Sequence, residues 1–453
     1  MVNPLYLPEL REMIAENNAD QLREFCEALH PARTADFMEG LEPQEAWLVL
    51  SHTDEQNRVA IFNYFEPSLQ ISIIETLDRK AVAGLISELA PDDRVDLLND
   101  VEPAIVEELL PLLPTEERRD ILHLSSYPEG TAGAVMTTDV AKLAETLTIR
   151  EAIEQLQQQS AELETIYYLY VVDEQDHLRG LVSARQILST IRRPETRLNE
   201  IMETGLVTAE VDDDQEEVAQ KVARYDLLAI PVVDLERKML GIITYDDVID
   251  VMMEEATEDA YRSAAVEPLE DSYLATSVKT LVWKRGVWLI VLFVAALATA
   301  YVLAHYESYL EKPGWQWLVW FIPLVISSGG NAGNQSATLV IKALTNEEIE
   351  TQDWLKVVRR ELLTSLVLGL FLGGCGLLAG LAMTPEARTI GGMWVLPTTI
   401  ASVVMVGSVV GSVLPLAFEK IGLDPALMSN PFVAGIIDIV GIVIFLNVAW
   451  MLL

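Results

Sequence analysis

The last 25 residues, SNPFVAGIIDIVGIVIFLNVAWMLL (429–453), decide the class of this protein. Apart from Asp438 they carry no charge, and the apolar run exceeds the roughly 20 residues that cross a bilayer core. Similar apolar stretches occur upstream, near 286–305, 315–344, 361–383 and 393–417. The sequence therefore predicts an all-α transmembrane domain of five helices over 279–453.

Charge is segregated from these apolar stretches. The chain has 453 residues and a formal charge of −38, yet residues 278–453 hold 10 basic and 11 acidic side chains. That leaves 21 basic and 58 acidic side chains on residues 1–277, a net charge of −37. Such a region repels nucleic acid and anionic lipid and attracts cations. With only Cys26 and Cys375, in different halves, the sequence predicts no disulfide framework.

Loop charges predict the orientation of the membrane domain. One side of the predicted spans carries eight basic residues: Lys279, Lys284, Arg285, Lys342, Lys356, Arg359, Arg360 and Lys420. Only Lys312 and Arg388 fall on the other side. Because cytoplasmic loops are enriched in Lys and Arg, we expect the acidic region in the cytoplasm and the C-terminus outside. The predicted location is the plasma or inner membrane.

Residues 1–129 are expected to form an acidic α-superhelical domain. Prolines recur at near-regular intervals in amphipathic segments such as LEPQEAWLVL (41–50) and FEPSLQISIIETL (65–77). Proline is well tolerated in the first turn of a helix, so each one indicates a helix start. Repeated short helices that cannot bury their own apolar faces stack into a solenoid.

Residues that follow this domain contain an internal duplication. YLYVVDEQDHLRGLVSARQIL (168–188) aligns with LAIPVVDLERKMLGIITYDDVI (228–249), and Gly180 matches Gly241 at a spacing of 61. Apolar runs joined by a polar turn and followed by a helix indicate a β-hairpin and a helix in each copy. The pattern resembles a tandem pair of CBS (α/β) domains, which are often ligand sensors and often dimerise. The alternative is a duplicated fold that only links its neighbours. The expected segments are two CBS repeats and an acidic connecting helix: 130–196, 197–254 and 255–278.

Two features place polar groups where lipid would be expected. Asp438 lies about eight residues, roughly 12 Å, along a helix from Asn430. A carboxylate at that depth nearly always faces a cavity, a partner or a pathway, and the alternative is a protonated Asp bonded to a neighbouring helix. The second feature is ISSGGNAGNQSATLV (326–340), where close helix packing explains the glycines but not the Asn and Gln side chains. Pro323, just upstream, predicts a bend.

These features suit a cation that prefers oxygen ligands. Mg²⁺ keeps several waters and is held through one or two carboxylates. One Asp in each chain is few for such a site, but a two-fold homodimer would bring two Asp438 side chains together. Mn²⁺, Co²⁺ and Ni²⁺ also bind oxygen ligands, so the sequence does not choose among these ions.

The chain resembles the MgtE family of Mg²⁺ channels over nearly its whole length. The most specific stretches are SSGGNAGNQSATL (327–339), GLDPALMSNPFVAGIIDIVG (422–441) and YDDVIDVMMEEATEDAY (245–261). The resemblance implies a homodimeric, Mg²⁺-gated, Mg²⁺-selective channel for Mg²⁺ uptake, and not an enzyme. It also implies a pore lined by the second and fifth spans, with Asp438 at the ion-selecting site and Asn331 and Ala434 nearby.

The same resemblance implies feedback gating. Cytosolic Mg²⁺ would bridge the N-terminal domain, the CBS pair and the connecting helix, and close the pore. Carboxylates three and four residues apart on one helix repel unless a cation screens them, so Mg²⁺ should order these segments. The alternative for each single residue is a solvated surface role. The expected sensor residues are Asp92, Asp96, Asp214, Glu216, Asp226, Asp246, Asp247, Asp250, Glu255, Glu258 and Asp259.

One departure concerns nucleotides. In many CBS repeats an Asp after the Gly-hydrophobic-Ser/Thr strand holds a nucleotide ribose. The second copy has Asp247 at this place, whereas the first copy has Gln186. The resemblance therefore leaves ATP binding to the CBS pair open, and ATP is not among the predicted ligands.

Three other functions stay open on the sequence alone. A secondary transporter that couples a divalent cation to H⁺ or Na⁺ would use Asp438 as a proton carrier and would need those gradients. A membrane enzyme is disfavoured because the spans lack H-E-x-x-H, G-x-S-x-G and paired carboxylates. A pure sensor would tolerate neutralisation of Asp438.

Overall fold

The structure is a computed structural model that describes residues 7–453 apart from 160–162, 270–272, 275, 347, 385–386, 388 and 426–429. Arg388, one of the loop charges behind the predicted orientation, therefore lies outside the described residues. The chain divides into two compact units, Met1–Glu254 and Glu255–Leu453. Each unit is described by itself.

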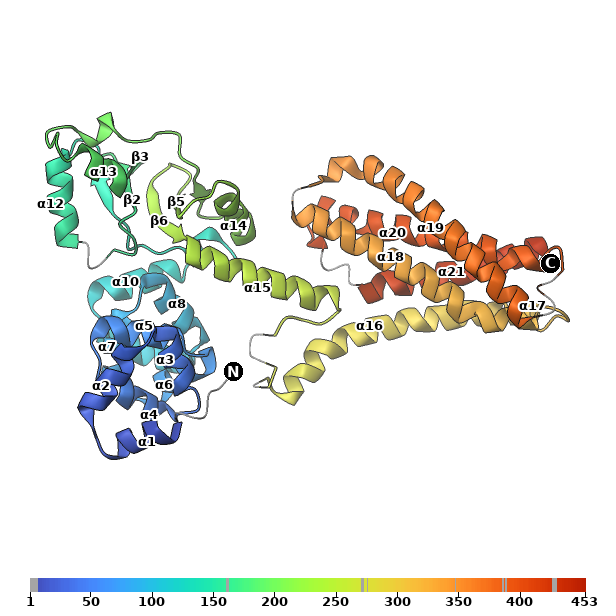
Figure 1. Cartoon of the computed structure of the whole chain (residues 1–453), viewed down its shortest axis with the longest axis horizontal. Coiled ribbons are helices and arrows are strands. Elements are labelled where there is room, and N and C mark those ends of the chain that lie inside the picture. Colours follow the sequence, from blue (N-terminus) through green and yellow to red (C-terminus); the bar gives the residue numbers. More distant parts are fainter. Residues whose placement is uncertain are drawn as a thin grey trace. The chain divides into compact units, whose positions relative to one another are not determined.

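The first unit opens with ten short helices in the part of the chain that the structure describes (Figure 1). Five of them begin on a proline, as the spacing predicts: Pro31, Pro43, Pro67, Pro91 and Pro103. The fixed φ of proline suits the first helical turn, where its missing N–H breaks no bond. The helices are α1 Leu7–Ala15, α2 Ala19–Ala28, α3 Pro31–Met38, α4 Pro43–Leu50, α5 Glu55–Asn63, α6 Pro67–Thr76, α7 Arg79–Glu88, α8 Pro91–Asp100, α9 Pro103–Leu109 with the 3₁₀ turn η1 Leu110–Leu112, and α10 Thr115–Leu124.

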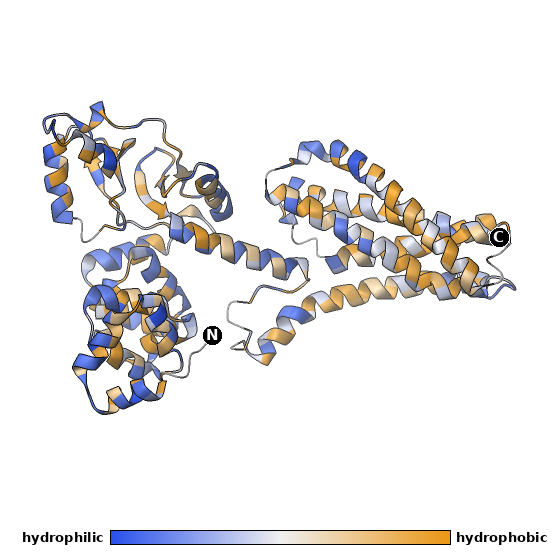
Figure 2. Cartoon of the chain, viewed as in Figure 1, coloured by the Kyte–Doolittle hydropathy of each residue, from blue (hydrophilic) through white to orange (hydrophobic). Residues whose placement is uncertain are grey.

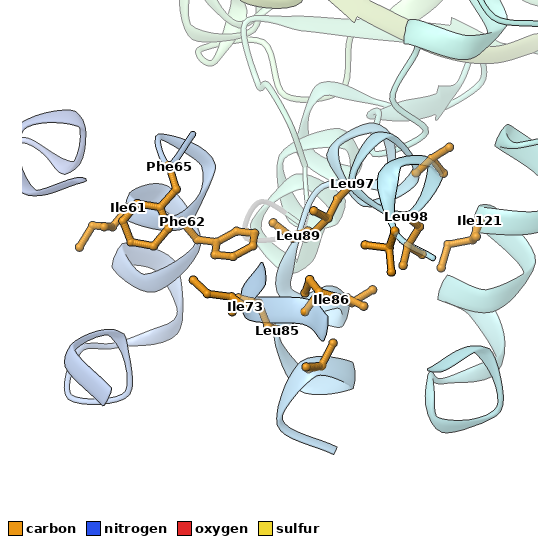
Figure 3. Close-up of a cluster of buried hydrophobic side chains, with 14 of the residues drawn as sticks. Ile61, Phe62, Phe65, Ile73, Leu85, Ile86, Leu89, Leu97, Leu98 and Ile121 are labelled. Atoms are coloured by element: carbon orange, nitrogen blue, oxygen red, sulfur yellow. The ribbon is translucent and has the colours of Figure 1, made fainter. Parts of the chain in front are cut away.

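The apolar faces of these helices form one continuous core. Figure 3 shows part of it, where Phe62 from α5, Ile73 from α6 and Leu85 from α7 meet. Each fully buried side chain of this size contributes roughly 1.5–3 kcal/mol. The same core continues into the second CBS copy through Val218 and Ile230. This shared core explains why the helical domain and the CBS pair form one compact unit.

The CBS pair shows the predicted duplication directly. Each copy has a three-stranded sheet in which one strand pairs in parallel with the first strand of an antiparallel hairpin. The strands are β1 Lys142–Ala144, β2 Tyr168–Val172 and β3 Leu178–Ser183 in the first copy, and β4 Ala209–Glu210, β5 Ala229–Val233 and β6 Met239–Thr244 in the second. The helices are α11 Ala132–Val135, α12 Ile149–Gln159, α13 Ala184–Thr190, η2 Leu198–Glu200, α14 Gln215–Arg224 and α15 Tyr245–Ser263.

Gly180 and Gly241 match because each hairpin lies against the opening segment of the other copy. A Cβ on Gly241 would lie 2.4 Å from the carbonyl oxygen of Thr137, and one on Gly180 would lie 2.7 Å from that of Glu203. Side chains do not tolerate such distances, so only glycine fits. The two copies are interlocked at these points.

The connecting helix differs from the expectation of a separate helix over 255–278. α15 starts at Tyr245, directly after β6, and ends at Ser263. The next helix begins at Val278. The acidic run therefore belongs to one continuous helix that leaves the second CBS copy.

The second unit contains five long helices within its described residues. Four of them, α16, α19, α20 and α21, are long and apolar enough to cross a membrane (Figure 2). α18 is outside that group because the polar run 326–340 forms its middle. The helices are α16 Val278–His305, α17 Glu307–Leu310, η3 Gln316–Phe321, α18 Ile322–Thr345, η4 Thr351–Asp353, α19 Trp354–Met383, α20 Gly392–Lys420 and α21 Asn430–Leu452.

Two details of α18 position the candidate site. Pro323 lies in its first turn, so the expected bend is a helix start. Along its length α18 packs backbone to backbone on α20, because a Cβ on Gly411 would lie 2.1 Å from the carbonyl oxygen of Gly333. A Cβ on Gly407 would likewise lie 2.5 Å from that of Gly329. Small residues permit this close approach between membrane helices.

Candidate metal sites

Asp438 and Asn331 lie on two helices, α21 and α18, that pack beside each other. A Cβ on Gly330 of α18 would lie 3.6 Å from the Cβ of Ala434 on α21. Asn331 directly follows Gly330, and Asp438 lies about one helical turn after Ala434. The structure thus brings the three residues expected at the ion site onto adjoining segments of two helices.

α18 presents polar side chains on a face that its own bundle leaves exposed. Nδ2 of Asn331 donates to Oγ of Ser327 at 3.3 Å, and the Thr338 hydroxyl donates to Oδ1 of Asn430 on α21 at 3.3 Å. Unsatisfied polar groups are costly in hydrocarbon. The face therefore fits a wet path or a second copy better than lipid. We call it the polar stripe: Ser327, Asn331, Gln335, Thr338 and Lys342.

The exposed side of α19 provides the contrast. Beyond Glu361 its exposed large side chains are apolar, among them Leu363, Val367 and Phe371, which is the composition expected for contact with lipid. Neighbouring helices of one unit thus present two different surfaces.

Asp438 is half-buried and makes no hydrogen bond or ion pair with the described part of the chain. Its neighbours Ile437 and Ile442 are fully buried apolar side chains of α21. An ionised carboxylate in such surroundings needs water or a cation to balance its desolvation. The internal partner that would make Asp438 a purely structural residue is missing from the described residues.

A second group of acids joins the N-terminal helices to the CBS pair. Asp92 is its most buried member, with 8% of its surface exposed and an Oδ1 atom that has no hydrogen-bond partner. Asp93 accepts a hydrogen bond from Asn63, and Asp247 accepts one from the Thr244 hydroxyl. We call this group the α8–α15 cluster: Asp92, Asp93 and Asp96 from α8, Glu164 before β2, and Asp246, Asp247 and Asp250 from α15.

Burial and mutual repulsion disfavour charge in the α8–α15 cluster. Burial, followed by the charges of Asp247 and Asp93, raises the pKa of Asp92 well above its ordinary value. Burial and neighbouring carboxylates raise the pKa of Asp96 and of Glu164 to about 7. Asp96 and Glu164 are exposed, so water screens part of this repulsion. A cation placed among these groups would stabilise their ionised forms.

The acids farther along α15 face a different set of partners. Arg262 pairs with Glu258 on its own helix and with Asp424, which follows α20. Burial, followed by Asp424 and Glu255, raises the pKa of Asp259. We call this second group the α15 end: Glu255, Glu258, Asp259, Arg262 and Asp424. Through the pair of Arg262 and Asp424, the α15 end connects α15 to the segment that follows α20. The next helix in the chain, α21, carries Asp438.

The remaining expected sensor residues have local roles. Asp214 caps α14 by accepting a hydrogen bond from the backbone N–H of Glu216 at 2.9 Å. Glu216 accepts one from Nε2 of Gln220 at 3.3 Å. Asp226 is exposed in the turn after α14, with a φ of 51° that Asp adopts more readily than most residues. Capping and turn formation account for Asp214 and Asp226 without a metal.

Direct chelation does not describe these sites. Among the described residues, no three Asp, Glu, His or Cys side chains converge closely enough to hold a metal ion together. Mg²⁺ dehydrates reluctantly and is usually held by one or two carboxylates through several retained waters. Widely spaced carboxylates match a hydrated ion better than a dry cage.

Sequence reasoning missed four of the charged residues, and the first of them, Asp93, lies directly beside the expected Asp92. Glu164 and Arg262 belong to no motif, although Arg262 is the lone base that follows the acidic run. Asp424 lies within the segment 422–441, and its position between the last two predicted spans was the available signal. Their partners come from distant parts of the chain and appear only after folding.

Comparisons with known families cover most of the chain. Residues 322–448 match the divalent cation transporter family MgtE. Residues 29–130 match the MgtE intracellular N domain, and 132–193 and 198–254 each match a CBS domain.

Individual relatives extend this similarity to full length. The chain is 35% identical to the magnesium transporter MgtE of Thermus thermophilus over 98% of both chains. It is 30% identical to the magnesium transporter MgtE of Enterococcus faecalis over 98% of this chain and 96% of the other. The crystal structure of the cytosolic domain of the Mg²⁺ channel MgtE in complex with ATP covers 53% of this chain and 98% of its own, with a TM-score of 0.50 and 34% identity.

Proposed function

Because the chain belongs to the MgtE family of magnesium transporters, we propose that it is a Mg²⁺-selective channel that Mg²⁺ itself gates. Asp438 carries the proposal. A half-buried carboxylate on an apolar helix, without a partner among the described residues, needs a counter-charge. A passing cation supplies that charge in a pathway, which is the usual role of intramembrane acids.

Permeation would follow the surface shared by α18 and α21. Asp438 supplies charge, while Asn331 and the rest of the polar stripe supply neutral oxygens that hold the outer waters of a hydrated ion. The polar stripe is exposed within a single chain, which supports a homodimer whose two-fold axis brings two such faces together. Two Asp438 side chains would then balance one Mg²⁺.

The acidic region would lie in the cytoplasm. Basic residues at the starts of α16 and α19, such as Lys279 and Arg359, support that orientation through the positive-inside rule. Cytosolic Mg²⁺ would then meet both acidic groups.

Gating would use the two acidic groups of α15. In the α8–α15 cluster, Mg²⁺ would offset the repulsion around Asp92 and hold α8 against α15. At the α15 end, Mg²⁺ would add to Arg262 in holding α15 to the segment before α21. High cytosolic Mg²⁺ would favour this ordered state and close the pore. ATP, which the solved relative binds, stays outside the proposal because Gln186 replaces the Asp expected in the first CBS copy.

The test is Mg²⁺ flux into proteoliposomes that contain the purified full chain. Wild-type protein should carry Mg²⁺ down its electrochemical gradient with no H⁺ or Na⁺ gradient. Asp438→Asn should lose at least about 90% of this flux, the tenfold factor that about 1.4 kcal/mol of lost ion stabilisation produces. Asn447→Ala, on the same helix, is the matched control and should conduct normally.

Either of two results would refute the proposal. Flux that disappears when the H⁺ and Na⁺ gradients are collapsed would identify a coupled transporter. Full flux in a folded Asp438→Asn protein would remove the ion site from α21.

A further inference from the structure

Glu361 is a carboxylate that neither the polar stripe nor the acidic groups include. It lies on α19, a helix apolar enough to span a membrane, about ten ångströms from its first residue at 1.5 Å per residue. The buried face of α19 includes Val357, Ser365 and Gly369. Glu361 lies four residues after Val357 and four residues before Ser365, so it is on the same face. Glu361 thus lies on the packing face of α19, where an ionisable side chain is costly and usually has a functional role.

Its one hydrogen bond among the described residues goes to α18. Oγ of Ser336 donates to Oε2 of Glu361 at 2.6 Å. Ser336 is 4% exposed, so this bond forms inside the bundle. The bases that precede Glu361 in sequence do not pair with it in the described structure; Lys356, for example, pairs with Asp353.

Ser336 differs from other serines of the bundle in the direction of its bond. Ser328 donates to the carbonyl of Leu324, Ser365 to that of Leu362 and Ser412 to that of Val409, all within their own helices. Such local bonds do not link one helix to another. The bond from Ser336 crosses from α18 to α19 and therefore constrains how α18 is turned about its axis.

That rotation decides where the polar stripe points. At 3.6 residues per turn, Ser336 lies about 140° around α18 from Asn331 and about 180° from Ser327. The bond to Glu361 therefore acts on the side of α18 opposite the polar stripe. On the other side, Thr338 reaches Asn430 of α21. Together with the glycine contacts between α18 and α20, the two bonds hold α18 between its neighbours.

We infer that Glu361 is a positioning residue for ion passage: its carboxylate holds Ser336 and thereby fixes the rotation of α18 that turns the polar stripe toward the ion path. The inference rests on the proposed Mg²⁺ channel function. It assigns Glu361 no contact with the ion. Selectivity, which depends on where Asn331 and its neighbours sit, is the property that this bond protects.

The experiment compares Mg²⁺ and Ca²⁺ flux through the full chain in proteoliposomes. The flux ratio does not depend on how much protein folds, so a loss of stability alone leaves it unchanged. Ser336→Ala and Glu361→Ala should each lower the Mg²⁺-to-Ca²⁺ ratio about tenfold, the factor for a hydrogen bond at the strong end of those between membrane helices. The double variant should be no worse than either single one, because both remove the same bond.

Two further variants separate positioning from charge. Glu361→Gln keeps an oxygen that accepts from Ser336, so its ratio should stay within about twofold of wild type, since the bond is retained. Ser365→Ala, a buried serine one turn along α19 with a bond only inside its helix, is the matched control and should behave as wild type. If Glu361→Ala does not fold, the other two variants still test the inference. The Mg²⁺-to-Ca²⁺ flux ratio should fall in Ser336→Ala and should stay close to wild type in Glu361→Gln.

The outcomes distinguish this inference from the proposed function. Wild-type protein without Mg²⁺ flux would defeat the channel itself. Wild-type flux with unchanged ratios in Ser336→Ala and Glu361→Ala would defeat the positioning role alone. An equal loss in Glu361→Gln would overturn it as well, because the charge and not the bond would then matter.

Discussion

Neutralising Asp92 should change stability in opposite directions depending on Mg²⁺. Without Mg²⁺, Asp92 is a buried carboxylate with an unpartnered oxygen beside Asp247 and Asp93. Asp92→Asn removes the charge and keeps the shape, so the metal-free protein should become more stable. With Mg²⁺, the same change removes a carboxylate that the proposal places beside the hydrated ion, and it should reduce the stabilisation that the ion provides.

The size of each effect follows from the burial of Asp92. An unsatisfied buried polar group costs about 1–3 kcal/mol, and more when it is charged. Asparagine retains one unpartnered oxygen, so we expect a gain of about 1–2 kcal/mol, or about 2–8 °C in Tm for a unit of this size. Wild-type protein gains about 2.7 kcal/mol at a Mg²⁺ concentration of 100 Kd. A tenfold weaker site gains about 1.4 kcal/mol less, so the Mg²⁺-induced rise of the variant should be about half as large.

The pH dependence has a definite sign. The pKa of Asp96 and that of Glu164 are raised to about 7 in the folded protein. Between the ordinary carboxyl pKa of about 4 and this value, the folded state binds more protons than the unfolded state. The free energy of unfolding should therefore fall as pH rises from about 4 to 7 without metal. Mg²⁺ should flatten this slope, because it stabilises the ionised carboxylates.

Residues 1–263 provide the assay. The described residues of the two units have separate apolar cores, and this fragment ends with α15. Trp47, on α4, is its only tryptophan and reports unfolding by fluorescence. Thermal melts of wild type, Asp92→Asn and the exposed control Glu75→Gln are compared in EDTA and in Mg²⁺. A variant that melts below wild type in EDTA, or that responds to Mg²⁺ as wild type does, would refute the reasoning.

Two other predictions concern helix packing and gating. Gly411→Ala places a Cβ 2.1 Å from the Gly333 carbonyl oxygen and should destabilise the membrane unit by about 3 kcal/mol or more. Gly374→Ala, which meets no atom within 4 Å, should have no effect on thermal melts in detergent, and equal melts for the two variants would contradict the backbone packing of α18 on α20. Neutralising Glu255, Glu258 and Asp259 together should raise the Mg²⁺ concentration that halves flux about tenfold, as expected when about 1.4 kcal/mol of Mg²⁺ binding energy is lost. Neutralising exposed Asp20, Glu24 and Glu27 makes the same change in net charge and should not shift that concentration; equal shifts in both triple variants would rule out the α15 end as a sensor.

Features that depend on local chemistry could be predicted from the sequence. Pro31 and Pro43 begin helices because proline fits a first turn, and the 61-residue spacing of Gly180 and Gly241 revealed two copies of one fold. Four of the five long helices followed from apolar length, whereas the polar run 326–340 keeps α18 out of that group. Pro323 was misinterpreted as a bend because a proline inside an apolar run looks the same whether it starts a helix or kinks one.

Features that depend on distant partners could not be predicted. The acidic run of α15 appears uniform in sequence, yet Asp247 faces α8 while Asp259 faces Asp424. Glu361 follows two arginines in sequence, and only the fold shows that it turns toward Ser336. A charge pattern gives the composition of a site, whereas the partners depend on packing.

The surroundings of Asp438 on α21 and Glu361 on α19 also favour a channel over a proton-coupled transporter. A proton carrier needs titratable or hydroxyl groups within hydrogen-bond reach, so that each proton has a route in and out. Among the described residues Asp438 has no such neighbour, and the hydroxyl beside Glu361 belongs to Ser336, which already donates to it. A hydrated Mg²⁺ carries its own ligands and needs no relay, only a carboxylate and a polar surface beside it. Asp438 and the polar stripe supply those two elements, whereas a proton route would need a titratable or hydroxyl group within hydrogen-bond reach of Asp438, which the described residues do not provide.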